Sequence, residues 1–128
     1  MSTRSPAYHH GDLRNALILA AAELIEERGG ADFAMVDAAR RAGVSSAAPY
    51  RHFSDKTALL DAVIDFAFFT LGEQVAAVVQ TEPHGSAEAI IAIGKAYIRF
   101  VCEHRPFYGL MWGDAGIRAI REKESDER

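Results

Sequence analysis

Residues 39–60 read ARRAGVSSAAPYRHFSDKTALL, and they carry the strongest structural signal in the sequence. Gly43 separates two short runs of helix-forming residues, and the second run carries Pro49. Proline is tolerated in the first turn of a helix, because the N–H that it lacks would have no partner there. The pattern predicts a tight turn at Gly43, followed by a short helix over residues 46–53 that Ser45 or Ser46 caps.

Helical periodicity continues on both sides of this stretch. Residues 12–28 form one predicted helix, which the glycines at 29 and 30 end, and residues 35–42 form a second. A long helix of about residues 55–80 follows a cap at residues 54–56. The residues expected to face inward are Leu13, Leu17, Ala20, Ala21, Leu24 and Ile25 in the first helix, Val36, Ala39 and Ala42 in the second, and Leu60, Val63, Ile64, Ala67, Leu71, Val75 and Val78 in the long one.

The second half of the chain keeps the helical pattern. Residues 81–85 form a linker, and Ser86 opens a helix that reaches about His104. Pro106 interrupts that helix, and a weak last helix is expected around residues 115–123, with a fraying tail from residue 122. The residues expected inward are Ile90, Ile93, Tyr97, Phe100 and Val101. Because no strand pattern competes, the predicted fold class is all-α.

Composition and charge narrow the class of protein. The 128 residues carry a net charge of −4, from 14 basic and 18 acidic residues. All the excess acid lies in residues 57–128, whereas residues 38–56 are basic, with Arg40, Arg41, Arg51 and Lys56 against Asp55. A basic patch on an acidic body is compatible with specific nucleic-acid binding.

The expected compartment is the cytoplasm. The single cysteine, Cys102, excludes an internal disulfide, suits a reducing compartment, and is expected to be a small buried apolar residue. The N-terminus has no apolar core of a signal peptide, and no uninterrupted apolar run approaches 18 residues, so no spanning helix and no membrane partner are expected.

Helix, glycine-containing turn and helix form the unit that places its second helix in a DNA major groove. Small side chains at residues 45–48 allow close approach to base edges, and an alanine methyl suits a thymine methyl. Arg51 suits a guanine edge or a phosphate, and its neighbours suit phosphates. The predicted DNA-binding residues are Ser45, Ser46, Ala47, Ala48, Tyr50, Arg51, His52 and Lys56.

Several of these residues also have a purely structural interpretation. Phe53 is expected in the core, Tyr50 suits a phosphate contact or a packed ring equally, and one of Arg40 and Arg41 is a candidate phosphate contact or a solvated charge. His9 and His10 lack the spacing of metal ligands on one helix face, so an N-terminal arm without metal is expected. No nucleophile–base pair, phosphate-cradling loop or ligand cluster stands out, so neither an enzyme nor a cofactor is expected.

The stretch FAMVDAARRAGVSSAAPYRHFSDKTALLDAV resembles the DNA-binding module of TetR-family transcription regulators. The residues that carry the resemblance are Ala42, Gly43, Val44, Ser45, Tyr50, His52, Phe53, Lys56, Leu59 and Leu60. The lead at residues 8–12 and HRPFYGLMWGD at residues 104–114 are similar to one subgroup. The sequence departs from the family pattern in two ways. Ala38, preceded by Asp37, stands where the family usually has isoleucine or leucine, and Met35 and Val36 replace the polar or basic residues often found at the start of that helix.

The resemblance implies a helix-turn-helix domain over residues 11–71, with its motif at 34–53, and a partial helical domain over residues 72–128. In the family the second domain dimerises and binds a small effector that alters DNA affinity, and members normally extend well past 128 residues. Aromatic linings also build small-molecule pockets. The candidate effector-pocket residues are Phe66, Phe69, Tyr97, Phe100, His104, Tyr108 and Trp112, although each also suits a core.

The resulting functional prediction is a DNA-binding repressor that a small hydrophobic effector releases. Its expected partners are a palindromic double-stranded operator and, if the C-terminal part is complete, a second copy of the chain. One alternative is a truncated helical interaction module that does not bind DNA by itself. Another is a helical ligand-binding or enzyme domain, which would need a closed pocket.

Overall fold

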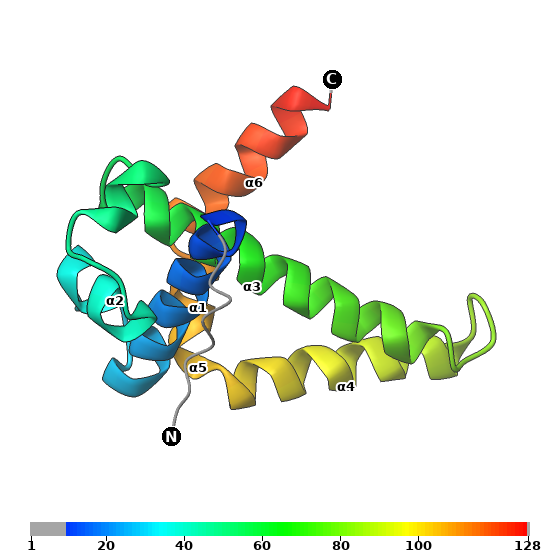
Figure 1. Ribbon diagram of the computed structural model, residues 1–128. Coiled ribbons are helices and arrows are strands. Elements are labelled where there is room, and N and C mark those ends of the chain that lie inside the picture. The colour runs from blue at the N-terminus through cyan, green and yellow to red at the C-terminus, as the bar shows by residue number, and fades with distance from the viewer. Residues whose placement is uncertain (1–9, 128) are drawn as a thin grey trace. The chain divides into compact units, whose positions relative to one another are not determined.

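A computed structural model of the chain describes residues 10–127 (Figure 1). All regular structure in that range is helical, which confirms the all-α class. The elements are α1 (His10–Arg28), α2 (Met35–Ala42), the 3₁₀ helix η1 (Ala48–Arg51), α3 (Lys56–Val79), α4 (Ala87–Glu103), α5 (Arg105–Met111) and α6 (Asp114–Asp126). Two compact units meet between Val63 and Ile64, inside α3, whereas the sequence places the boundary at residue 71. They are called the N-terminal and C-terminal units below.

The core of the N-terminal unit forms where α1 packs against α2. All six residues predicted to face inward from α1 are buried. In α2 the prediction is right for Ala39 and Ala42 and wrong for Val36, which is exposed. The buried residues of this helix, Met35, Ala38, Ala39 and Ala42, follow the i, i+3, i+4, i+7 spacing of one helical face. Residue 36 lies off that face.

Gly43 makes the turn that the sequence predicts. Its φ of 75° lies in the left-handed region, which glycine enters without a Cβ penalty. The Gly43 N–H donates to the Arg40 carbonyl at 3.1 Å, and the Val44 N–H donates to the Ala39 carbonyl at 3.0 Å. This pair of bonds is the Schellman motif, which satisfies the last carbonyls of α2 and reverses the chain.

The predicted third α-helix over residues 46–53 is wrong. The structure has one 3₁₀ turn, Ala48–Arg51, and its N-cap is Ala47, with no serine side chain capping it. Its bonds join residues three apart: Ala48 to Ser45, Tyr50 to Ala47 and His52 to Pro49. Pro49 has no N–H to donate four residues back, to Ser45, which removes the bond that would start an α-helix here.

Helix α3 starts as predicted, because Asp55 Oδ1 accepts the Ala58 N–H at 2.9 Å. Of its predicted buried stripe, Val63, Ile64 and Ala67 are buried, and the other four residues are half-buried. By length and composition alone α3 is long and apolar enough to cross a membrane, with 28% of its most apolar window buried. Core helices of soluble proteins pass the same test, so this result does not assign α3 to a membrane. The expectation that no helix could span a membrane, which was based on the length of apolar runs, does not stand.

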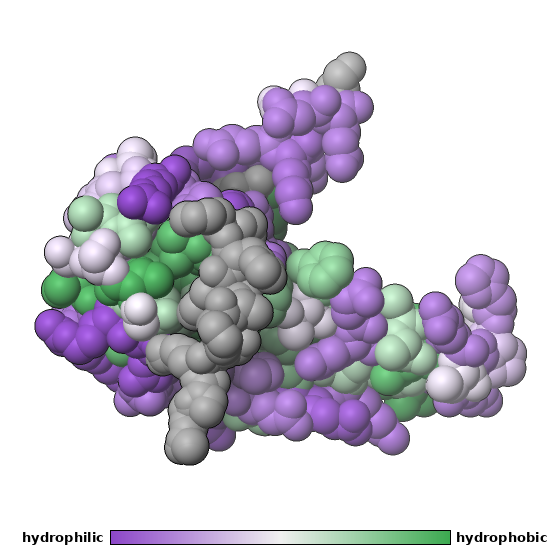
Figure 2. Space-filling model, viewed as in Figure 1, coloured by the Kyte–Doolittle hydropathy of each residue, from purple (hydrophilic) through white to green (hydrophobic). Residues whose placement is uncertain are grey.

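In the C-terminal unit, α3 and α4 run antiparallel and are joined at residues 80–86 (Figure 1). Ser86 caps α4 as predicted, and its Oγ accepts the Ala89 N–H at 3.1 Å. The inward set is partly wrong: Phe100 is buried, but Ile93 is exposed and Ile90 is 68% exposed. Small residues, Ala89 and Ala96, take the buried face with Phe100, and the isoleucines are left outside. Figure 2 shows the resulting apolar surface among hydrophilic side chains along this hairpin.

Two helices complete the C-terminal unit. Pro106 lies in the first turn of α5, and Phe107 and Met111 of that helix are buried. Helix α6 reaches Asp126, so the prediction that the tail frays from residue 122 is wrong within the described residues. Cys102, expected to be buried, is exposed.

Candidate nucleic-acid interface

In the turn and η1, most of the predicted DNA-binding residues are exposed and some of their neighbours are buried. Pro49 and Phe53 are buried, as expected for Phe53, and so is Ala48. Ala48 was predicted to contact DNA, but its methyl group packs in the core and is not offered to a base. The residues that remain exposed are Ser45, Ser46, Ala47, Tyr50, Arg51 and His52, called the turn surface below.

Tyr50 had two interpretations in the sequence, and its exposure separates them. The residue is 56% exposed, so its ring is not packed into the core. Its neighbours Arg51 and His52 are exposed as well. The 3₁₀ turn therefore offers an aromatic hydroxyl, a guanidinium and an imidazole to solvent, and all three can bond a phosphate.

Lys56, a predicted phosphate contact, makes its contacts within the N-terminal unit. Its ammonium donates to the Ala31 carbonyl, and Nζ lies 4.8 Å from the centroid of the Phe33 ring. The residue is half-buried, and its charge is engaged by the loop between α1 and α2 (residues 29–34). Sequence reasoning missed this contact, which joins residues 25 positions apart.

The two arginines of α2 have different environments. Arg41 pairs with Glu27 of α1 through two bonds of 2.8 and 2.6 Å. The hydrogen bond from Arg41 lowers the pKa of the Glu27 carboxyl and, reciprocally, raises the pKa of Arg41. Arg40 has a side chain that is 75% exposed and lies 3.5 Å from Asp37. Arg40 is therefore the better candidate for a phosphate contact.

Asp37 organises the start of α2. Its Oδ2 accepts the Ala34 N–H at 2.8 Å and lies 3.3 Å from Arg28 Nη1, while Arg40 approaches Oδ1. The Ala34 hydrogen bond, together with the charges of Arg28 and Arg40, lowers the pKa of the Asp37 carboxyl. Asp37 thus supplies the hydrogen bond that a helix start requires.

The pKa of the Asp37 carboxyl is lower in the folded protein than in the unfolded chain, so the unfolded chain binds a proton at this group more readily. The stabilisation that Asp37 provides is therefore complete above the ordinary aspartate pKa and is lost as pH falls through the lowered one. We expect Asp37→Asn to reduce the Tm at pH 7 and to converge with the wild type at the acid end of a thermal-melt series. Glu73→Gln, at an exposed position on α3, serves as the charge control. A constant Tm difference down to the acid end would contradict this linkage.

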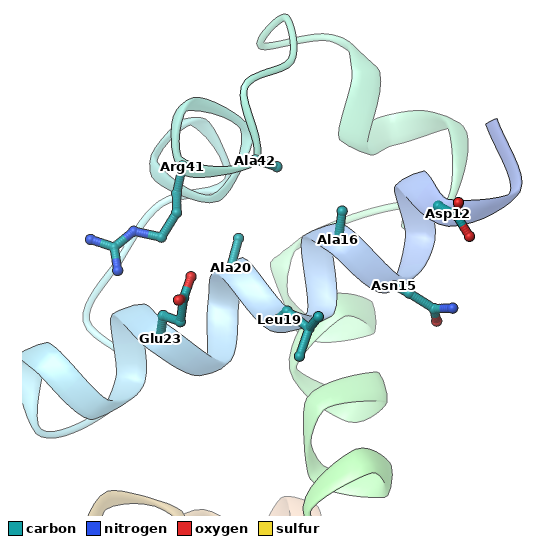
Figure 3. Close-up of a pocket in the computed structure, with 8 residues that line it drawn as sticks. All are labelled: Asp12, Asn15, Ala16, Leu19, Ala20, Glu23, Arg41 and Ala42. Atoms are coloured by element: carbon teal, nitrogen blue, oxygen red, sulfur yellow. The ribbon is translucent and has the colours of Figure 1, made fainter. Parts of the chain in front are cut away.

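A cleft of about 450 Å³ lies between α1 and α2 (Figure 3). Figure 3 shows Asp12 and Asn15 near one end, with Glu23 and Arg41 on opposite walls at the other. The lining is Asp12, Asn15, Ala16, Leu19, Ala20, Glu23, Arg41 and Ala42. Its carboxylates disfavour a phosphate, and no predicted site residue lines it.

The predicted effector residues fall into three environments. Phe100 is buried, with the His104 ring 4.9 Å from its own, and Tyr97 and His104 are half-buried. The exposed members are Phe66, Phe69, Tyr108 and Trp112. The Trp112 ring packs edge-on against the Phe68 ring, with 5.5 Å between the ring centroids. A cavity of about 240 Å³ in the same unit has a different lining: Asp65, Phe68, Ile120, Lys123, Glu124 and Glu127. The effector pocket thus remains a prediction.

No group of potential ligands that could hold a metal ion occurs among the described residues. Of the two neighbouring histidines considered as ligands, His9 lies outside the described residues, and His10 is the first residue of α1.

Comparison with known proteins shows which family this helical arrangement resembles. A profile described as bacterial regulatory proteins, tetR family, matches residues 17–63. The nucleoid occlusion factor SlmA of Marinomonas sp. (strain MWYL1) is 34% identical over 71 residues, which cover 56% of this chain and 36% of that protein. A solved structure of a protein with unknown function from Rhodococcus sp. RHA1 matches with a TM-score of 0.73 and 32% identity, over 90% of this chain and 63% of its own.

This chain therefore spans only part of the length of both relatives. The family match covers α2, the Gly43 turn and η1, and so includes every residue of the turn surface. The N-terminal unit of this chain is a helix-turn-helix domain of the TetR family.

Proposed function

We propose that the chain is a sequence-specific DNA-binding transcriptional regulator and that the turn surface contacts the DNA. One observation carries the proposal. Within a TetR-family domain, Ala48, Pro49 and Phe53 are buried, while the polar and basic residues beside them in sequence are exposed. The buried residues thus anchor this segment in the core, while its hydrogen-bonding side chains are exposed to solvent.

Each exposed side chain has a distinct expected role. Arg51 suits a guanine edge or a phosphate, and Ala47 replaces Ala48 as the candidate for a thymine methyl. Tyr50 and His52 suit phosphates, and Arg40 adds an exposed charge from α2. Of the eight predicted residues, Ala48 and Lys56 leave the proposed contact set, since one is buried and the other is engaged by the α1–α2 loop.

The recognition element is a single 3₁₀ turn, so one copy offers few base contacts. Specific binding therefore requires two copies on a palindromic operator, with half-sites about 34–36 Å apart or a multiple of that spacing. We propose a homodimer in the cytoplasm, acting as a repressor, and no enzymatic activity. We also propose that a small hydrophobic effector reaches the aromatic residues around Phe100, which are half-buried and contribute both apolar and polar atoms.

The test is a salt titration of binding to duplex DNA, with the mass of the free protein measured in the same buffer. Arg40 and Arg51 in two subunits provide four guanidinium charges, which predict a slope of log K against log salt of about −4. The double variant Arg40→Gln, Arg51→Gln should flatten the slope toward zero. A steep slope that survives this double change would contradict the assigned surface.

A second candidate function is the helical interaction module. It is favoured by large apolar side chains exposed on α3 and α4, Phe69, Ile90 and Ile98 among them. A monomer that binds no duplex even at low salt would support this alternative and overturn the regulator proposal.

A further inference from the structure

The α1–α2 loop (residues 29–34) receives contacts from three helices. Arg28 of α1 donates from Nη1 to the Asp32 carbonyl at 3.0 Å. Asp37 of α2 accepts the Ala34 N–H at 2.8 Å. Lys56, the first residue of α3, donates to the Ala31 carbonyl. One short loop is thus held by a side chain from each of the three helices.

The Lys56 contact has two parts. The ammonium bonds a backbone carbonyl, and it also lies over the face of Phe33, a ring that is itself buried. A cation over an aromatic face is attracted by the negative potential of the ring, more strongly when both are partly removed from water. Lys56 is half-buried, so its geometry is set by the loop rather than by solvent.

These contacts determine how the turn surface is held. The segment that carries it, residues 43–55, leaves α2 and enters α3. Helix α2, which precedes this segment, is bonded to the loop at its own first turn through Asp37. The first turn of α3, which follows the segment directly, is bonded to the same loop through Lys56. The segment therefore connects two helices that are both tied to one loop, and Lys56 ties its α3 end directly, which restricts the positions that Tyr50, Arg51 and His52 can take.

We propose that Lys56 is a positioning residue for DNA binding. It fixes the first turn of α3 to the α1–α2 loop and so keeps the turn surface in its binding arrangement, without contacting a phosphate itself. The proposal rests on the proposed function. It differs from a phosphate contact in one measurable respect: a phosphate contact contributes to the salt dependence, whereas a positioning contact does not.

The experiment replaces Lys56 by Met in the whole chain, which keeps the aliphatic stem and removes the charge and the donor. We expect duplex affinity to fall about tenfold, the lower end of the range for a lost hydrogen bond to a charged group. The slope of log K against log salt should stay unchanged. Amide hydrogen exchange in the free protein should speed up within residues 31–34 and 48–56. All measurements are made well below the Tm of the variant, so that global unfolding does not contribute.

Three further variants sharpen the test. Lys56→Arg keeps a donor and a charge and should restore most of the affinity. Lys95→Met removes an exposed lysine of α4 and should change neither affinity nor exchange in those segments. Phe33→Leu removes the aromatic face, and combining it with Lys56→Met should cost less affinity than the sum of the two single changes, because both act through one contact.

Two outcomes would overturn the proposal. One is a salt slope that falls in magnitude by about two in Lys56→Met, about one for each subunit of the dimer, which identifies a direct phosphate contact. The other is unchanged exchange in both segments, which shows that Lys56 does not restrain them. The exchange measurement needs no DNA, so it decides the positioning role even if the wild-type chain binds no duplex, a result that would contradict the proposed function alone.

Discussion

Replacing Leu17 by Ala is expected to lower the free energy of unfolding of the N-terminal unit by about 2–5 kcal/mol. Leu17 is 0% exposed and lies in the middle of α1, on the face that forms the core of the unit. Removing its side chain takes away apolar contacts and leaves a cavity that the neighbouring helix can fill only in part. A loss of this size is a large fraction of the stability of a small domain.

Leu19→Ala is the matched control, because it makes the same chemical change two residues along the same helix. Leu19 is 50% exposed, so its loss should change the free energy of unfolding by less than about 0.5 kcal/mol. Urea unfolding followed by far-ultraviolet circular dichroism measures both variants. The single tryptophan, Trp112, reports separately on the C-terminal unit. Equal losses at positions 17 and 19 would contradict the burial assigned to α1.

Periodicity in the sequence predicts α1 well because a long helix averages over many positions. Its six predicted core residues all agree with the structure, since any other helical face would bury charged residues such as Glu23 or Glu26. The Gly43 turn was equally predictable, because a left-handed residue after a short helix strongly favours glycine. Capping by Asp55 and Ser86 follows the same local logic.

Short or uniformly apolar helices were harder to predict. Helix α2 has eight residues, and a shift of one position exchanges Val36 for Met35 as the buried residue. Helix α4 carries isoleucines on more than one face, and hydrophobicity alone favours burying Ile90 and Ile93. The structure instead buries Ala89 and Ala96 there, which places small side chains on the packed face. Which face is packed depends on the neighbouring helices, and the sequence of α4 does not contain that information.

The candidate site shows the same division between local and long-range information. The exposed residues Tyr50, Arg51 and His52 could be located from the turn and the proline that precede them. The engagement of Lys56 by the α1–α2 loop could not, and neither could the pair between Glu27 and Arg41, because these contacts join positions 25 and 14 residues apart. Such pairs require the helix-to-helix arrangement, which periodicity does not specify.

Arg51 gives the second large expected effect, on binding rather than stability. Arg51→Ala should weaken operator binding by about 1–3 kcal/mol, which is about five- to 150-fold, if its guanidinium reads a guanine edge. The side chain is exposed at the end of η1, whereas the nearby residues Pro49 and Phe53 are buried. The change should therefore leave the Tm nearly unaltered, since it removes no core contact.

The measurement begins with selection of a preferred duplex from a random library, followed by titration of that duplex and its point variants with wild type and Arg51→Ala. A base contact predicts that the variant loses discrimination at one base pair of each half-site, whereas a phosphate contact predicts a uniform loss and a salt slope smaller by about two, one for each subunit. Arg51→Lys separates the two further, because lysine keeps the charge but not the planar two-donor geometry that a guanine edge requires. Arg99→Ala, at an exposed position on α4, removes the same charge from the C-terminal unit and should leave binding unchanged. Equal losses in Arg51→Ala and Arg99→Ala would mean that net charge, and not the turn surface, determines affinity.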